Sequence, residues 1–273
     1  MSSGHLVEIV ACGKNNNYKS MIKFFRNIRK KLLAEGNTSK YLKYAIGEIV
    51  LVVIGILIAL QINNWNEDRL EQREETKLLE NLKIDFKQTI VELNEMNSNR
   101  QIILSANYEL TKLNPNDEFL NTKKIDTLIG FTFIVPTFNG KSGSLMVLLN
   151  SGKINILKNE ALKKLLFSWP SEVEDMTEGE IDSKKLTLES YLPIVRKYAN
   201  VSEIIRTSPV LPIKPQIRPK GINSNYKDLL NDREFTSLLY HLELFALDNI
   251  QETEKLIKIS ESIIEIIDSE LKQ

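Results

Sequence analysis

The stretch YAIGEIVLVVIGILIALQI, from Tyr44 to Ile62, decides how the rest of the chain is interpreted. Its uninterrupted apolar run, Ile49 to Leu60, is too short by itself to cross the hydrocarbon core of a bilayer, which takes about 20 residues of helix. The flanking residues bring the stretch to the required length. Its one carboxyl, Glu48, lies near the N-terminal edge, where it can reach the headgroups. The stretch therefore predicts one membrane-spanning helix.

The flanks of this stretch support the prediction and indicate an orientation. Aromatic residues stand at its edges, as is usual at membrane interfaces: Tyr41, Tyr44 and Trp65. Basic residues precede it, against the single acid Glu35: Lys19, Lys23, Arg26, Arg29, Lys30, Lys31, Lys40 and Lys43. Acidic residues dominate just after it: Glu67, Asp68, Glu71, Glu74, Glu75 and Glu80. Because Lys and Arg are retained in the cytoplasm, we expect the N-terminus inside and the C-terminal part outside.

Two other interpretations of the stretch are a cleaved signal peptide and a buried helix of a soluble protein. A signal peptide has a short basic region and a small-residue cleavage site. Here the basic region is long, and ALQINNW offers no such site. A buried soluble helix explains neither the aromatic edges nor the uneven charge. Both observations favour the membrane span.

The span divides the chain into four expected parts. Residues 1–20 are expected to be a disordered or non-native leader. Residues 21–43 form a basic amphipathic cytoplasmic segment whose Lys and Arg face suits an anionic inner leaflet. Residues 44–62 are the transmembrane helix. Residues 63–273 form an extracytoplasmic domain that we expect to be all-α, elongated and packed like a helical bundle.

Two segments resemble a known family. MIKFFRNIRKKLLAEGNTSKYLKYAIGEIVLVVIGILIALQINNWNE (Met21 to Glu67) is similar to the N-terminus of a family of single-span bacterial membrane proteins of unknown function. SGSLMVLLNSGKINILKNEALKKLL (Ser142 to Leu166) is similar to a second part of that family. The resemblance implies a single-pass protein of the bacterial inner membrane whose chain opens at the equivalent of Met21. It implies no catalytic residue.

Beyond the span, Asn66 to about Leu113 is predicted to be one long helix, because it contains neither Pro nor Gly. It carries an apolar stripe: Leu79, Leu82, Phe86, Ile90, Leu93, Met96, Ile103, Leu110 and Leu113. A dimeric coiled coil and packing against later helices of the same chain are both open. The polar run from Asn97 to Arg100 interrupts the heptad pattern, which favours the second.

The remaining helices are predicted from caps and stripes. A short helix covers Leu145 to Leu149, and Asn159 is the predicted N-cap of a longer one. Pro170 kinks or splits that helix, and a capping box at Ser171 favours a restart. Asn231 or Asp232 caps a final helix that runs to about Lys272. The predicted core face of that helix is Leu239, Leu242, Ala246, Ile250, Ile257, Ile264, Ile267 and Leu271.

Two segments between these helices are left with alternatives. Residues 123–138 contain TFIVPTF, which predicts either an extended segment or a short helix before a turn. Residues 208–225 are rich in proline. They fit a crossing loop between helices, and a ligand for a peptide-binding module is the alternative.

The sequence offers no catalytic motif, metal site or cofactor site. Basic and acidic residues balance at 36 each, and the bases concentrate before the span, so no basic surface suggests nucleic acid. The one cysteine, Cys12, lies in the leader, so the outer domain has neither a disulfide nor a Cys-based metal site. Gly140, Lys141 and Ser142 lack the first glycine of a phosphate-binding loop. His241 is expected to be packed or half-exposed rather than to bind a ligand. The three rings Trp169, Tyr191 and Tyr198 could line a ligand pocket between helices, but core packing is favoured.

Within the span, Gly55 and Ala59 form a small-xxx-small pair, and Glu48 lies near the same face. These three residues are the predicted helix–helix contact, through self-association or docking to another membrane helix. We therefore expect an interaction or accessory subunit of a membrane complex, not an enzyme. Its expected partners are the lipid bilayer and a membrane or periplasmic protein, with homo-oligomer formation open. The alternative function is a helical ligand-binding sensor that signals through its single span.

Overall fold

The computed structural model describes residues 26–27, 30–31, 38–140, 143–209, 216 and 222–272. Within these ranges the chain is helical, with no strand. It divides into two compact units, Met1–Leu70 and Glu71–Gln273, and each is described by itself. The predicted leader (residues 1–20), most of the basic segment and most of the proline-rich segment lie outside the described residues.

The first unit contains the predicted span, which forms part of helix α2 (Thr38–Thr111). Side chains from Ile49 to Leu70 are all exposed. Within the described residues, α2 is the one helix long and apolar enough to cross a membrane. The core helix of a soluble protein can meet the same criterion, but it would be buried, and the apolar window of α2 is not buried at all. By its length and composition, this part of α2 could cross a membrane.

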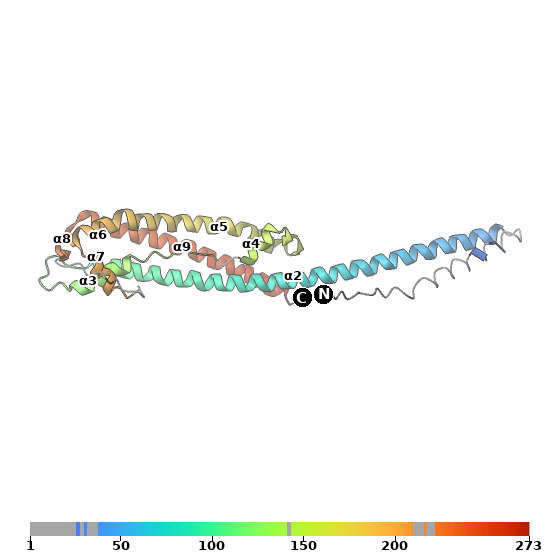
Figure 1. The fold of residues 1–273 in the computed structure, drawn as a ribbon, viewed down its shortest axis with the longest axis horizontal. Helices are drawn as coiled ribbons and strands as arrows, with labels where there is room; N and C mark the ends of the chain where they lie inside the picture. Colours follow the sequence, from blue (N-terminus) through green and yellow to red (C-terminus); the bar gives the residue numbers. More distant parts are fainter. Residues whose placement is uncertain are drawn as a thin grey trace, which may run out of the picture. The chain divides into compact units, whose positions relative to one another are not determined.

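The second unit is built on three long helices: the C-terminal part of α2, α5 (Glu160–Lys185) and α9 (Arg233–Glu270). Figure 1 shows α5 and α9 lying along this part of α2. Phe86 of α2 meets Trp169 of α5 edge-on, with ring centroids 4.9 Å apart. Lys83 of α2 pairs with Asp268 near the end of α9. The pairings place α2 and α5 parallel and α9 antiparallel to both.

The buried positions of α2 repeat in alternating steps of four and three residues. They are Glu75, Leu79, Leu82, Phe86, Thr89, Leu93, Met96, Arg100, Ile103, Asn107 and Leu110, and Ala106 is buried beside Asn107. This is heptad spacing, and it places one face of the helix against its neighbours. The predicted packing within the chain is confirmed, but the predicted interruption of the heptad is wrong. The pattern continues through the polar run because Arg100 itself occupies a core position.

Helix α9 follows the same spacing, which corrects part of its predicted core face. Leu239, Leu242, Ala246 and Ile267 are buried as predicted. Ile250, Ile257, Ile264 and Leu271 are only partly buried. The positions that continue the repeat are buried instead: Asn249, Thr253, Leu256, Ser260 and Ile263. The bundle therefore buries small polar side chains where the spacing requires them and leaves neighbouring isoleucines at the boundary.

Helix α5 runs without a break through Pro170, so the predicted restart at Ser171 is wrong. A proline inside a helix removes one hydrogen bond and costs about 3 kcal/mol. Here Pro170 is exposed, and the residues that hold the helix lie around it: Leu166, Trp169 and Met176 are all buried. Tertiary packing on both sides of the proline outweighs the lost bond and keeps one helix axis.

The connection from α2 to α5 runs back along α2. Helix α3 (Thr122–Thr132) is followed by a non-helical segment to residue 140. The region therefore contains a short helix before a turn, as one alternative predicted, and a non-helical segment after it. The Asn139 N–H donates to Glu92 of α2, and the Ser144 N–H donates to Asp85. Helix α4 (Gly143–Asn150) and the short turn η1 (Lys153–Ile156) complete the return. Carboxylates along α2 thus hold the returning backbone.

The caps of the two later long helices are confirmed. The Asn159 side chain accepts from the Leu162 N–H at 2.9 Å, and the Asp232 carboxylate accepts from the Glu234 N–H at 2.8 Å. Between α5 and α9 lie a π-helical turn η2 (Leu186–Tyr191), α6 (Leu192–Tyr198), α7 (Val201–Thr207) and α8 (Tyr226–Asn231). These short helices cover the end of the bundle near α3 and form a second apolar cluster.

Candidate functional site

The three residues predicted to contact another membrane helix all lie in the first unit. Ala59 is exposed, Glu48 is partly buried, and a Cβ added at Gly55 would meet no described atom within 4 Å. The small pair is therefore presented on an accessible helix face. The packing of another helix on this face stays a prediction.

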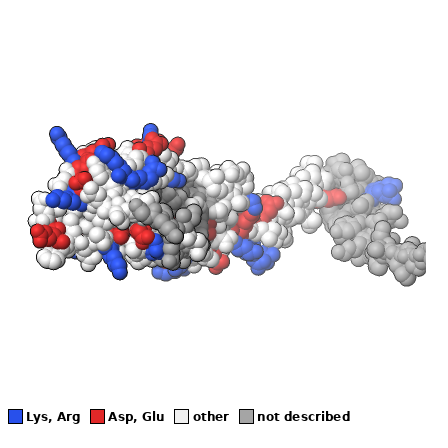
Figure 2. All heavy atoms as spheres, turned by 60° about the vertical axis from the view of Figure 1, so that its left-hand side comes forward, with Lys and Arg blue, Asp and Glu red and all other residues white. Residues whose placement is uncertain are grey.

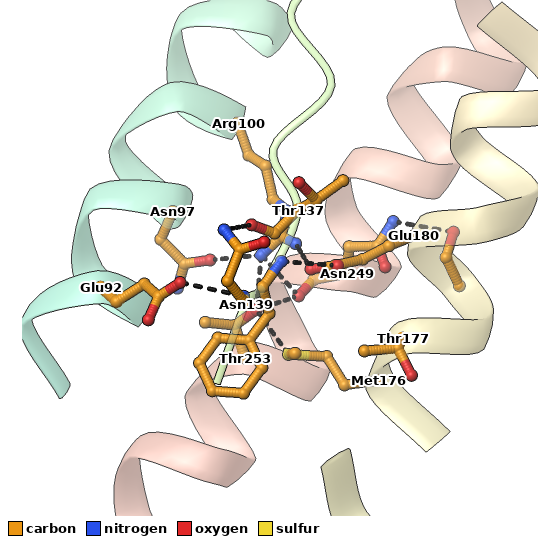
Figure 3. A network of polar contacts seen from close by, with 12 residues as sticks. Glu92, Asn97, Arg100, Thr137, Asn139, Met176, Thr177, Glu180, Asn249 and Thr253 are labelled. Carbon is orange, nitrogen blue, oxygen red and sulfur yellow. Dashed lines mark hydrogen bonds and ion pairs between the residues drawn. The ribbon is translucent and has the colours of Figure 1, made fainter. Parts of the chain in front are cut away.

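The most distinctive site in the second unit is a buried polar layer around Arg100. Its guanidinium reaches from α2 between α5 and α9 (Figure 3). Nη2 donates to Glu180 Oε1 of α5 at 2.8 Å, and Nη1 donates to the Thr253 hydroxyl and to the Asn249 carbonyl oxygen of α9. The Asn97 side chain accepts a further bond at 3.1 Å. One side chain thus ties together the three long helices.

Glu180 connects this layer to the returning segment. Its second carboxylate oxygen accepts from the Phe138 N–H at 2.9 Å. Arg100 and Glu180 expose only 2% and 4% of their surfaces. Burial raises the pKa of Glu180, opposed by the Phe138 bond and the charge of Arg100. Burial likewise lowers the pKa of Arg100, opposed by Glu180. Arg100 and Glu180 each offset part of the cost of burying the other's charge. Loss of one therefore leaves the other buried without its counter-ion.

Asn249 packs unusually close to α5 beside this layer. Its side-chain Nδ2 donates to the Gly179 carbonyl, while its buried Oδ1 has no hydrogen-bond partner among the described residues. A Cβ added at Gly179 would lie 2.7 Å from that Oδ1. A cavity of about 20 Å³ adjoins the layer, lined in part by Arg100, Glu180 and Asn249. That volume holds about one water molecule.

A second group of buried polar contacts lies near α3. The Tyr191 hydroxyl is 2.8 Å from Thr132 Oγ1, and its ring stacks on Phe235. Tyr226 hydrogen-bonds to the Asp126 carboxylate of α3. Burial raises the pKa of Asp126, although the Tyr226 bond opposes the shift. These contacts fasten α3 to the short helices at this end of the bundle.

The residues that the sequence offered as ligand candidates are placed elsewhere. Trp169 and Tyr191 are core residues, Tyr198 is partly buried against the second apolar cluster, and His241 is exposed. An open groove between α5 and α9 is lined by five carboxylates and by Lys255, which pairs with Glu252; the carboxylates are Asp175, Glu178, Asp182, Asp248 and Glu252. Within the described part of the chain, no three His, Cys, Asp or Glu side chains are arranged to hold a metal ion.

The described surface of the second unit carries mixed charges and several exposed apolar side chains, three of which line up on α9. Blue and red side chains alternate over the face of the second unit drawn in Figure 2, as on a solvated surface. On α9, Tyr240, Leu244 and Leu247 expose 59%, 64% and 51% of their surfaces. Their spacing of four and three residues puts them on one side of the helix, opposite the buried Leu242 and Ala246. This stripe is the apolar feature of α9 that its own bundle does not cover.

Comparison with known proteins gives a family and nothing more specific. A family of unknown function, DUF6090, matches residues 48–187, which is just over half of the chain. The chain belongs to the DUF6090 family. The matched region includes Arg100 and Glu180, while the contribution of α9 to the polar layer lies beyond it. A family of unknown function is what the sequence resemblance implied. No curated protein and no solved structure matches this DUF6090 protein.

Proposed function

We propose that this DUF6090 protein is a membrane-anchored, non-enzymatic interaction module, acting as an accessory subunit of a membrane complex. The exposed apolar stripe Tyr240–Leu244–Leu247 on α9 is the observation that carries the proposal. Single exposed apolar side chains are normal on any protein. Three on successive turns of one face are typical of a helix that packs against another helix.

The anchor is the exposed apolar part of α2. Its length and composition suit a bilayer, and the basic residues before it favour a cytoplasmic N-terminus. The proposed location is therefore a bacterial inner membrane, with the second unit on the periplasmic side. An anchor of this kind restricts the search for partners to proteins of the same membrane and raises their effective concentration.

The occupant that we propose for the α9 stripe is an apolar helix of such a membrane partner. The spacing of four and three residues along α9 matches one side of a two-helix contact. Arg233 and Glu254 lie near the two ends of the stripe and are exposed, so the apolar contact is flanked by opposite charges. A partner helix with complementary charges would then dock in one direction.

The test uses the full chain in membranes. A photo-crosslinking residue at position 244 should yield one discrete adduct, and Leu244→Asp with Leu247→Asp should reduce recovery of that same partner about tenfold or more. Val91→Asp is the matched control, because Val91 is 60% exposed on α2 but lies outside the stripe. Equal recovery with both variants, or adducts from position 91 alone, would contradict the proposal. An adduct of twice the chain mass would assign the stripe to a homo-oligomer instead.

The alternative function, a ligand-binding sensor, gains no support from the cavity at Arg100. A volume of about 20 Å³ accommodates a water molecule but no organic ligand. The exposed stripe on α9 is the observation that favours the interaction module.

A further inference from the structure

The core of the bundle is nearly repetitive along its length. On α2, positions seven residues apart carry interchangeable apolar side chains, such as Leu79, Phe86 and Leu93. On α9, Leu256 and Ile263 repeat in the same way. Apolar contacts are non-directional, so sliding α2 by one heptad along its neighbours would replace most apolar contacts with similar ones. Apolar packing alone therefore specifies the axial position of α2 only weakly.

The polar layer removes this ambiguity. A slide of seven residues moves Arg100 by about 10 Å along the bundle axis. It would leave Glu180, the Asn249 carbonyl and the Thr253 hydroxyl behind. A buried guanidinium and a buried carboxylate would then both lack their partners, which is strongly unfavourable. In the observed register the same groups are all satisfied.

We propose that the Arg100–Glu180 ion pair is a register lock that holds the bundle part of α2 at one axial position against α5 and α9. The role goes beyond the proposed interaction function and does not depend on it. The lock has a third participant, because Glu180 also holds the Phe138 N–H of the returning segment. The ion pair therefore connects α2, through Glu180, to that segment as well as to α5.

The lock is tested by replacing the pair with neutral residues and measuring register directly. Arg100→Met with Glu180→Gln removes both charges and keeps an acceptor for the Phe138 N–H. Spin labels at positions 88 and 241, in a Cys12→Ser background, report the axial offset of α2 from α9, because Gln88 and His241 are both exposed. The parent should give one distance. The variant should add a population shifted by about 10 Å, one heptad of helix rise.

The control is the ion pair between Lys83 of α2 and Asp268 of α9, the two helices that carry the spin labels. Lys83→Met with Asp268→Leu removes a partly exposed pair that lies outside the core, and it should leave a single distance. A single unshifted distance in the Arg100→Met, Glu180→Gln variant would overturn the proposal. Loss of helicity in that variant would also overturn it, because the apolar repeat should hold the bundle together without the pair. A second population in the control would show that any ion pair sets the register.

Discussion

Arg100 is a polar residue that occupies a core position in the heptad pattern of α2. A polar side chain in an apolar stripe predicts an interruption, yet Arg100 continues the stripe as a core residue. Its burial depends on Glu180, which lies 80 positions away in the sequence. No local pattern connects the two. Caps are different, because Asn159 and Asp232 act on N–H groups within three residues, and both were predictable.

Gly179 provides the first prediction at the residue scale. In a helix interior, Gly→Ala ordinarily stabilises by about 0.5–1 kcal/mol. Here the new methyl group would lie 2.7 Å from Asn249 Oδ1 in a buried contact. Gly179→Ala should therefore lower the free energy of unfolding by about 1–3 kcal/mol, measured by chemical denaturation. Gly143→Ala is the control, since its Cβ would meet no described atom within 4 Å. A more stable Gly179→Ala protein would show that Asn249 moves aside freely.

Asp126 should make the free energy of unfolding fall as the pH rises, which is the opposite of the usual effect of a carboxyl group. Burial raises the pKa of its carboxyl above the unfolded value, so the native state holds the proton more tightly than the unfolded chain. The stability that this proton provides is present below the unfolded pKa and is lost as the pH rises through the folded one. Asp126→Asn keeps an acceptor for Tyr226 and cannot titrate. From about pH 4 to 7, the unfolding free energy of the parent should fall relative to that of Asp126→Asn. A flat or rising difference would contradict this assignment.

At the scale of elements, most helices could be predicted because their signals are local. The long helix after the span, the short helix near Leu145 and the final helix all follow from periodicity and caps. The face of α9 was only partly predictable. Counting by fours and threes from Leu239, Leu242 and Ala246 leads to Asn249, Thr253 and Ser260, but the hydrophobicity of Ile250, Ile257 and Ile264 points one residue away. Periodicity was the better guide because all three long helices share one core.

Pro170 gives the prediction at this scale. Because α5 is already one continuous helix, Pro170→Ala should restore a missing backbone bond without changing the fold. The melting temperature should rise, with a gain of about 1–3 kcal/mol in unfolding free energy. Thermal unfolding followed by circular dichroism measures this directly. A less stable variant would show that α5 needs a bend at this position to fit Phe86 and Trp169.

At the scale of the whole molecule, the sequence predicted the all-helical fold class better than it predicted the function. An all-helical chain with one apolar helix suited to a membrane could be predicted because both depend on long, strongly patterned segments. The polar layer at Arg100 and the outer stripe on α9 could not, because each depends on which faces meet in the folded bundle. The proposed function consequently rests on the exposed stripe of α9 and not on a sequence motif. It also requires the proposed membrane anchor in α2.

The accessibility of Cys12 tests that anchor most directly. Cys12 is the one cysteine of the chain and precedes the span, while His241 lies in the second unit. In intact cells, a membrane-impermeant maleimide should leave Cys12 unlabelled until the membrane is permeabilised. The same reagent should label His241→Cys, in a Cys12→Ser background, without permeabilisation. Equal labelling of both positions in intact cells, or protection of position 241 alone, would contradict a single span with its N-terminus in the cytoplasm.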